Sequence, residues 1–324
     1  MYGFKEAPAV TSRPSSTALL AISSKDRFKD YPAQRIGTEA GLTGPIPYNA
    51  SPYEFQIIKP ESIMNGFFTR LAVTEFSMDW VIPNINQFTD EIIVKGQTGG
   101  TGPINSYTIN IPQGFFAPSE IAAKLQTAIR LDTGFTGFTM TYGTDNNNPY
   151  FLYNTNSASQ KVAFQPLPAD NTYTANRKQL FDVLGFSVAN ETLQEAAGGN
   201  TTYCNYTDYI DVVCPTLTYN QPLKDTMSQS VARDSLCRVY LNQITGPLNA
   251  NTLAPGATGF APTGTRPFQV YHNYTHPKEI NWTPNQPVGQ LSFTLYDDSG
   301  NKLSDAVPST ADGNWSMSLL VSEN

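Results

Sequence analysis

In residues 71–80, one set of side chains at the odd positions alternates with a second set at the even positions. This two-residue period is the feature that most constrains the fold. Odd positions of an extended chain point to one side and even positions to the other, so the run predicts a β-strand. Pro83 follows it as a strand terminator. Shorter runs of the same kind recur with turn residues between them, which predicts a chain built mainly of strands. The predicted strands are 71–80, 91–95, 107–111, 138–142, 150–154, 209–213, 236–244, 268–274, 290–296 and 315–321.

Two segments carry the signals of a helix. In the first, Pro118 stands in the opening turn, apolar residues recur every four positions, and Gly134 follows the last turn. This pattern predicts a helix over 117–131. A shorter helix is predicted over about 177–185, where it closes on Gly185. So few helices among so many strands favour an all-β fold, a jelly-roll type β-sandwich with an inserted loop and helix region.

The first 60 residues differ from the rest of the chain. Prolines recur too often there for a helix, so residues 1–60 are expected to form an extended N-terminal arm. Residues 61–324 are expected to form the jelly-roll domain, with a possible insertion at about 97–205. A Gly/Pro-rich stretch at 246–267 is expected to be a long exposed loop.

The arm contains an apolar stretch at 18–22 followed by cationic residues. Such a strip gains free energy when it is buried against a partner. We therefore expect it to dock on a neighbouring subunit, and we expect residues 1–35 to be dispensable for folding but needed for assembly. The side chains expected to make this inter-subunit contact are Leu19, Leu20, Ile22, Lys25, Arg27 and Phe28.

Charged residues make up only 15 % of the chain, below the usual quarter, and the net charge is −7. A surface that binds nucleic acid needs many cations, so direct nucleic-acid binding by the body is not expected. Residues 1–35 hold six basic and three acidic side chains, which leaves open a solvated tail or an arm that docks on an acidic surface. The sequence shows no signal peptide and no apolar stretch near the ~18 residues of a transmembrane helix.

The residues that could form a chemical site are interpreted as structural. His272 and His276 lie ~13 Å apart if the segment is a strand, too far to share one ion. The turn at 297–301 lacks the spacing of a calcium loop, and Asp208 and Asp211 are more typical of an exposed strand end than of an acid/base pair. With no nucleophile or phosphate-loop motif, the chain is predicted to be non-enzymatic, without cofactor or metal.

The three cysteines, Cys204, Cys214 and Cys237, are odd in number and lack the spacing of a metal site. They are expected to be free thiols. No disulfide should then be needed for folding.

Several segments occur in a succession that resembles a known family. The succession resembles the penton and minor capsid proteins of eukaryotic double-stranded DNA viruses, including large icosahedral viruses, virophages and polinton-like viruses. The resemblance covers most of residues 18–324. The segments that carry it are 20–27, 68–76 (FTRLAVTEF), 83–86 (PNIN), 107–116 (YTINIPQGFF), 121–126, 180–186 (LFDVLGF), 277–282 and 291–296.

The resemblance implies a jelly-roll subunit of the virion that closes the five-fold vertices of an icosahedral capsid. Its implied partners are further copies of itself, as a homopentamer, the major capsid protein and other minor capsid proteins. Such a protein is made and assembled inside the host cell. The resemblance implies no catalytic residue.

Three alternatives stay open at this point. The resemblance also includes the cement role, that of a minor capsid protein between or beneath the major capsomers. A carbohydrate-binding attachment protein would use its aromatic side chains to stack on sugars. A jelly-roll hydrolase would use scattered Asp and Glu. The aromatic side chains considered for sugar stacking are Trp282, Trp315, Tyr271 and Tyr274.

Overall fold

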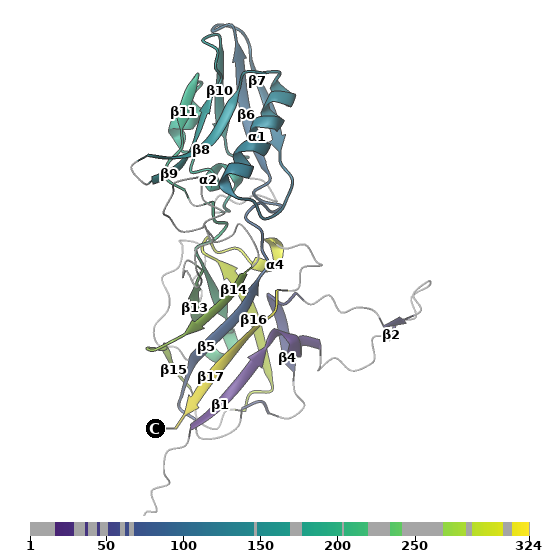
Figure 1. Cartoon of the computed structure of the whole chain (residues 1–324). Coiled ribbons are helices and arrows are strands. Elements are labelled where there is room, and N and C mark those ends of the chain that lie inside the picture. Colours follow the sequence, from purple (N-terminus) through teal and green to yellow (C-terminus); the bar gives the residue numbers. More distant parts are fainter. Residues whose placement is uncertain are drawn as a thin grey trace, which may run out of the picture.

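The structure is a computed structural model of the 324-residue chain. Two lobes lie one above the other, a β-sandwich and a smaller mixed lobe (Figure 1). The 246–267 loop expected from the sequence lies outside the described residues. These are 17–28, 36–37, 44–45, 51–58, 62–64, 68–145, 148–168, 177–202, 204–219, 234–241, 268–282, 287–306 and 313–323.

The sandwich consists of two antiparallel sheets. Sheet A has the strand order β1-β17-β5-β14, and β15 also pairs with β5. Sheet C has the order β4-β16-β12-β13. Sheet A comprises β1 (Thr17–Ser23), β5 (Arg70–Trp80), β14 (Phe268–Asn273), β15 (Glu279–Asn281) and β17 (Trp315–Ser322). Sheet C comprises β4 (Glu54–Ile58), β12 (Tyr209–Val213), β13 (Ser235–Tyr240) and β16 (Gln290–Asp297).

The order of the strands along the chain defines a jelly roll. With β15 set aside, sheet A takes the first, third, sixth and eighth strands, and sheet C takes the second, fourth, fifth and seventh. The last strand lies beside the first in sheet A, and the seventh lies beside the second in sheet C. This is the double Greek key of a jelly roll. The predicted all-β sandwich is confirmed, as are the strands expected at 209–213, 268–274, 290–296 and 315–321.

The N-terminal segment differs from the free arm expected from the sequence. Two of its stretches, β1 and β4, are the first and second strands of the jelly roll, paired with β17 and β16. The short strands β2 (Ile36–Gly37) and β3 (Gly44–Pro45) pair with each other. The pairing of β1 contradicts the expectation that residues 1–35 are dispensable for folding, because their removal would delete an entire strand of sheet A.

The core of the sandwich is aromatic at its centre. Trp315 contacts three phenylalanine rings, with centroids 5.5 Å from Phe55, 5.5 Å from Phe293 and 5.7 Å from Phe76. These residues come from both sheets, so they join the two layers. The Trp315 indole N–H donates to the carbonyl oxygen of Pro52 at 2.7 Å, which satisfies its polar atom inside the core.

A β-bulge in β5 changes which side chains face the core. Glu75 pairs with Ser318 and Val73 with Leu319, so Thr74 is the extra residue. The side chains that face the core are at odd positions before the bulge and at even positions after it. As a result, the odd residues Leu71 and Val73 and the even residues Phe76, Met78 and Trp80 are all buried.

The second lobe is inserted between β5 and β12. It contains the sheet β10-β6-β7 and the sheet β11-β9-β8. Its buried side chains form a separate cluster that extends from Ile85 to Cys204. We propose this lobe as the insertion expected at about 97–205. Its strands are β6 (Glu91–Thr98), β7 (Ile104–Asn110), β8 (Thr139–Asp145), β9 (Asn148–Asn154), β10 (Gln160–Gln165) and β11 (Ala196–Gly198).

Helix α1 (Pro118–Thr133) packs against both β7 and β8 and so closes the gap between the two small sheets. Ile121, Leu125 and Ile129 are buried, and Gly134 ends the helix at φ 73°. The helix predicted over 117–131 is confirmed. The second predicted helix is shortened to one turn, α2 (Leu180–Val183). Four further short helical segments among the described residues are η1 (Ser24–Phe28), η3 (Val188–Glu191), α3 (Pro215–Thr218) and α4 (Leu303–Ala306).

Contacts between the lobes centre on Arg177. Its guanidinium stacks over the Phe88 ring, 3.8 Å from the centroid, and pairs with Asp305 at 3.4 Å. Phe88 belongs to the sandwich core, and Asp305 lies in α4. Phe115 and Leu167 of the inserted lobe also pack on the sandwich core. The lobes are therefore joined by packed and charged contacts as well as by the chain itself.

The burial pattern of β1 yields a direct test. Ile22 is 3 % exposed and belongs to the sandwich core, whereas Leu19 on the other face is 65 % exposed. Ile22→Ala should destabilise the fold by about 2–3 kcal/mol, because it leaves a cavity in the core. Leu19→Ala, the matched control, should change the free energy of unfolding by less than about 0.5 kcal/mol. Urea unfolding at low protein concentration measures both, and equal effects would mean that β1 is not paired as described.

Candidate assembly surfaces

The six predicted contact residues fall into two groups. Leu20 packs on the sandwich core, and Ile22 and Arg27 are buried within their own subunit. Leu19 and Lys25 are exposed. Phe28 ends the 3-10 helix η1 (Ser24–Phe28), and its side chain lies outside the described residues. The structure therefore leaves Leu19 and Lys25 accessible to a neighbour, while Ile22 and Arg27 stabilise the subunit itself.

Arg27 holds the end of β1 against the start of β17. Its Nη1 donates to the Ser24 carbonyl oxygen at 2.6 Å and to Asn314 Oδ1 at 2.8 Å. Ser24 Oγ in turn donates to Asn314 Oδ1 at 3.2 Å and accepts from the Trp315 backbone N–H at 2.9 Å. A guanidinium that is 1 % exposed requires such partners. The cationic residue expected to bind a partner thus fastens the chain's own first and last strands.

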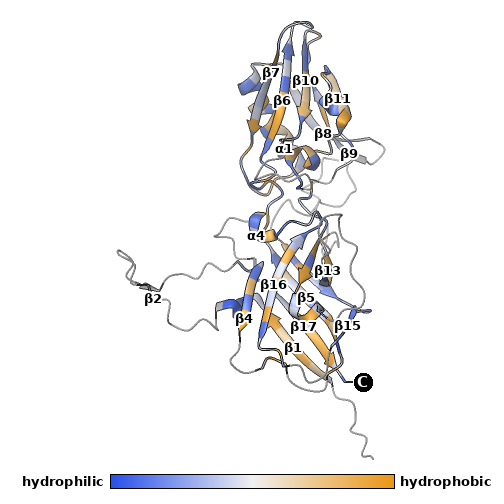
Figure 2. Ribbon diagram, turned by 180° about the vertical axis from the view of Figure 1, so that it is seen from behind, coloured by the Kyte–Doolittle hydropathy of each residue, from blue (hydrophilic) through white to orange (hydrophobic). Residues whose placement is uncertain are grey.

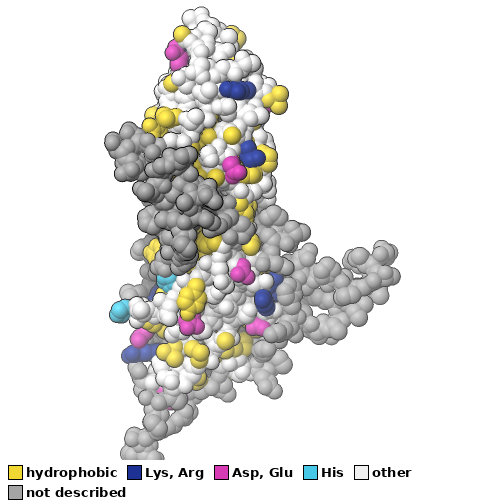
Figure 3. Space-filling model, viewed as in Figure 1, with side chains coloured by type: hydrophobic (Ala, Val, Ile, Leu, Met, Phe, Trp, Pro, Cys, Tyr) yellow, Lys and Arg dark blue, Asp and Glu magenta, His cyan; other side chains and the backbone are white. Residues whose placement is uncertain are grey.

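The outer surface of sheet A is uncharged along β1 and β17. Leu19 lies directly opposite Leu320, and both are exposed. Small residues surround this pair, and hydrophobic side chains are visible over this sheet in the lower lobe (Figure 3). We call this surface the β1 face. Its eight outward positions are Thr17, Leu19, Ala21, Ser23, Ser316, Ser318, Leu320 and Ser322.

Three exposed tyrosines lie at or near β13 and β14, with Tyr240 on the outer surface of sheet C and Tyr271 on the outer surface of sheet A. Tyr219 is 79 % exposed, Tyr271 is 53 % exposed and Tyr240 is 47 % exposed. β13 and β14 belong to different sheets, and the Tyr274 hydroxyl joins them by donating to the Arg238 carbonyl oxygen at 2.8 Å. We call this part of the sandwich the tyrosine side and define it by Tyr219, Tyr240 and Tyr271.

A buried ion pair supports the tyrosine side. Asp211 has a fully buried side chain and accepts from Arg238 Nε at 2.9 Å and Nη2 at 3.2 Å. The Arg238 guanidinium also stacks 4.0 Å from the centre of the Tyr209 ring, and Tyr209 contacts Tyr240 edge-on. The expectation that Asp211 lies at an exposed strand end is wrong, because Asp211 is the middle residue of β12 and is fully buried. Its carboxylate is occupied by the Arg238 guanidinium.

Most of the aromatics considered for sugar binding are in the core. Trp315 and Trp282 are buried, and Tyr274 packs against the same cluster. Tyr271 alone among those four is exposed. A sugar-stacking platform needs several accessible rings on one surface. These four residues do not form one.

The acidic turn at 297–301 is built from internal hydrogen bonds. Asp297 is buried, and its carboxylate accepts from the Tyr206 hydroxyl at 3.1 Å and from the Asn301 backbone N–H at 2.7 Å. Burial raises the pKa of Asp297, and it raises that of Tyr206 as well. Within the described part of the chain, no three His, Cys, Asp or Glu residues are grouped to hold a metal ion.

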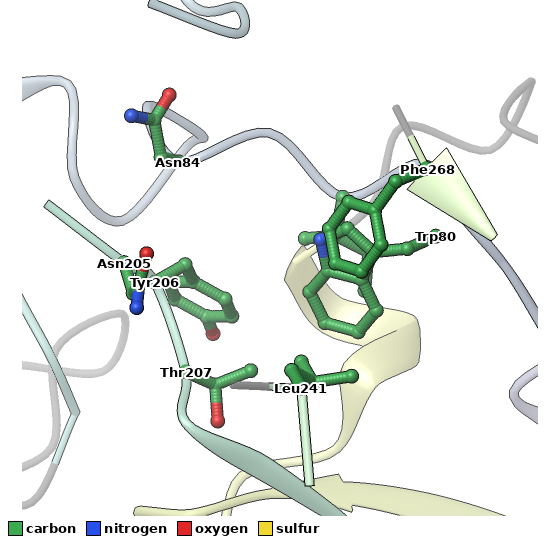
Figure 4. Close-up of a pocket in the computed structure, with 8 residues that line it drawn as sticks. Trp80, Asn84, Asn205, Tyr206, Thr207, Leu241 and Phe268 are labelled. Carbon is green, nitrogen blue, oxygen red and sulfur yellow. The ribbon is translucent and has the colours of Figure 1, made fainter. Parts of the chain in front are cut away.

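A small cavity lies where the sandwich meets the crossing segments to the second lobe (Figure 4). Its volume is about 10 Å³, enough for about one water molecule. Asn205, whose buried Oδ1 has no hydrogen-bond partner among the described residues, lines it together with Trp80, Tyr206 and Phe268. The cavity is too small for a sugar or a nucleotide.

The three cysteines are free and buried, as expected from the sequence. Burial raises the pKa of Cys214 to about 11 and that of Cys237 to about 12, and it also raises the pKa of Cys204. Because the thiolate is the reactive form, all three should be inert in the native state.

Thiol labelling tests this arrangement. The native protein should incorporate almost no iodoacetamide at about pH 8, and all three cysteines should react once the chain is unfolded in urea. Mass spectrometry counts the adducts. Rapid labelling of any of Cys204, Cys214 or Cys237 in the native protein would show that its burial is wrong.

The Asp211–Arg238 pair yields a second prediction. Arg238→Ala leaves a buried carboxylate without its partner and should destabilise the fold by about 3 kcal/mol. Arg70→Ala is the matched control, because Arg70 pairs with Glu279 at 3.1 Å on the surface, with both side chains largely exposed. That variant should lose less than about 1 kcal/mol. Thermal and urea unfolding measure the difference, and equal losses would contradict the burial of Asp211.

Sequence reasoning missed several of these features. A cation after an apolar strip resembles a docking signal, and no local feature of the sequence indicates that Asn314 is the acceptor of Arg27. Sequence reasoning also did not identify the tyrosine side. The position of Tyr240 at the end of a predicted strand was visible in the sequence, but its exposure depends on which strands lie beside it.

None of the described helices has both the length and the apolar character to span a bilayer. Compared by sequence, the chain matches no protein-family model and no curated protein. By structure it is similar to the mavirus penton protein, with 11 % identity and a TM-score of 0.49, over 94 % of this chain and 99 % of that one. It is also similar to a chain of the Sputnik virophage structure determined by cryo-EM, with 13 % identity and a TM-score of 0.41, over 94 % of this chain and 97 % of that one.

Proposed function

We propose that this chain is a structural virion protein, the penton subunit at the five-fold vertices of an icosahedral capsid, and that it acts through contacts between subunits. Its partners are further copies of itself, as a homopentamer, together with the major capsid protein and other minor capsid proteins. Assembly takes place inside the host cell. No catalytic step is part of the proposal.

The observation that carries the proposal is the strand order of the two sheets, β1-β17-β5-β14 and β4-β16-β12-β13. This jelly roll occurs in viral capsid proteins, and also in lectins and cupins. A fold shared by several functions does not choose among them. The sequence resemblance to penton and minor capsid proteins favours the capsid among these.

The placement of the inserted lobe supports a role in a ring. The lobe joins β5 to β12 and lies beyond one end of the sandwich (Figure 1). The two sides of the sandwich, along β1 and β4 and along β13 and β14, are therefore left for lateral neighbours. Subunits that pack side by side around a symmetry axis need exposed lateral surfaces to contact their neighbours.

The low charge of the chain supports burial of its surfaces in an assembly. Charged residues make up 15 % of the sequence. Interfaces between proteins are depleted of charged residues at their centre and enriched in tyrosine. The β1 face is uncharged, and Tyr219, Tyr240 and Tyr271 are exposed.

The copy number in purified particles tests the proposal. A penton subunit should be present at five copies for each vertex, a small fixed fraction of the major capsid protein, as measured by quantitative mass spectrometry. A cement protein should instead follow the number of major capsomers. Absence from purified particles would contradict the proposed function altogether.

A further inference from the structure

The two sheets of the sandwich differ in the protection of their edge strands. Both edge strands of sheet C, β4 and β13, contribute to an ion pair. Glu54 Oε1 of β4 lies 2.6 Å from Lys302 Nζ. Arg238 Nε of β13 lies 2.9 Å from Asp211 Oδ1. Charged side chains on an edge strand oppose its pairing with another chain, so sheet C is protected at both ends.

The edge strands of sheet A, β1 and β14, lack this protection. Their sequences, TALLAIS and FQVYHN, contain no Asp, Glu, Lys, Arg, Pro or Gly. Most of β1 is hydrophobic in Figure 2. Among the described strands, β1 pairs only with β17 and β14 only with β5, and neither pairing has a register shift. Natural proteins avoid straight, uncharged edges of this kind unless something covers them.

β15 limits the open edge beside β14. It pairs with β5 on the same side as β14, over the segment 70–72, and its residue Glu279 pairs with Arg70 at 3.1 Å. The unprotected part of this edge of the sheet is therefore β14 itself, which lies opposite the segment 75–80 of β5.

The two open edges run in opposite directions. Each neighbouring pair in the order β1-β17-β5-β14 is antiparallel, so β1 is parallel to β5 and antiparallel to β14. When copies of the chain stand side by side in the same orientation, β1 of one copy meets β14 of the next as an antiparallel pair. Antiparallel pairing is the more stable arrangement of two strands.

The two edges also match in the faces of their side chains. On β1, Leu19 is exposed on the outer surface of sheet A, whereas Leu20 and Ile22 face the core. On β14, Tyr271 is exposed on the same outer surface, whereas Val270 is buried. A shared ladder must keep outward residues opposite outward residues, because a slip of one residue exchanges the faces of a strand.

Only one register keeps the faces and uses the whole of β14. It places Leu19 opposite Tyr271, which brings two exposed apolar side chains together. A shift by two residues in either direction keeps the faces but leaves at least one residue of β14 without a partner in β1. The six pairs of this register are Thr17–Asn273, Ala18–His272, Leu19–Tyr271, Leu20–Val270, Ala21–Gln269 and Ile22–Phe268.

We propose that β1 of one copy pairs in this register with β14 of a second copy, so that sheet A continues from subunit to subunit. A contact between two different edges can be repeated around an axis, whereas β1 against β1 or β14 against β14 would end at a dimer. Backbone hydrogen bonds give such strand addition its affinity. The inference rests on the proposed penton function and names the contact that forms the ring.

The register also gives the stagger that a ring of strands requires. Within one subunit, Ala21 pairs with Ser318, and both Ser318 and Asn273 pair with Glu75, so Ala21 and Asn273 lie at one level. In the proposed ladder, Asn273 of the next copy lies opposite Thr17, four residues or about 13 Å along β1. Strands inclined to the axis produce such an offset, as in closed barrels, where tilt and stagger are linked.

The first test uses the full chain and two edge variants, Leu19→Lys and Tyr271→Lys, each at an exposed outward position. Tyr240→Lys is the matched control for Tyr271→Lys, because Tyr240 is similarly exposed but lies on the outer surface of sheet C. Leu131→Lys is the control for Leu19→Lys, because Leu131 is exposed on α1 of the inserted lobe. Thermal melting checks that all four variants fold like the wild type.

Native mass spectrometry across a concentration series then measures self-association. The wild type and both controls should form the same closed ring. Leu19→Lys and Tyr271→Lys should each associate at least about tenfold more weakly, because a lysine on an edge strand disfavours its pairing with another chain. If either variant associates as strongly as the wild type, the inferred pairing is wrong, while a penton built through other surfaces survives.

Cysteine cross-linking tests the register, since the three native cysteines are buried. With a short bis-maleimide, the double variant Leu19→Cys/Tyr271→Cys should form a covalent series of copies that ends at the ring. A mixture of the two single variants should form covalent dimers only, and each single variant alone should stay monomeric on a denaturing gel. Leu19→Cys/Tyr240→Cys is the matched control and should form no such series.

Two results would overturn the proposal directly. Efficient cross-linking of Leu19→Cys alone would show that β1 pairs with β1 of a second copy. A wild-type chain that shows no self-association at any concentration would exclude a second copy as the occupant of the β1 edge. The copy number in particles is measured independently, so a chain present at five copies per vertex that does not self-associate would refute this pairing without refuting the proposed function.

Discussion

The pairing of β1 with β17 is the constraint on which the rest of the sandwich depends. It brings the first and last strands of the jelly roll together and completes sheet A. The Arg27, Ser24 and Asn314 hydrogen bonds fasten one end of this pairing, and Trp315 begins β17 inside the aromatic core. Because these two strands are at opposite ends of the described sequence, sheet A can be completed only after the whole domain has been synthesised.

The same pairing produces the surface that we expect to contact a neighbouring subunit. β1 has a strand on one side only, so its outer edge and its exposed leucine remain available to a neighbour. The edge strands β4, β13 and β15 each contribute to an ion pair, and such charges disfavour unplanned association. Stability and assembly are thus divided between the two faces of one strand: Leu20 and Ile22 face the core, and Leu19 faces outward.

Periodicity and capping predicted much of the architecture. The helix of Pro118–Thr133 and the strands β12, β14, β16 and β17 follow from local patterns that tertiary packing did not override. β1 and β4 were missed as strands of the body because prolines surround them and their partners lie in the last part of the chain. Pairing between distant segments leaves no local signal. The bulge at Thr74 explains why β5 appears apolar on both faces, which alternation alone could not resolve.

The most direct test of the account is a cryo-EM reconstruction of the virus particle that contains this chain. The account predicts jelly-roll density at each five-fold vertex, with the sandwiches of neighbouring subunits side by side around the axis and the inserted lobe beyond one end of each sandwich. Density for the chain between or beneath the major capsomers, with the vertices occupied by another protein, would contradict it.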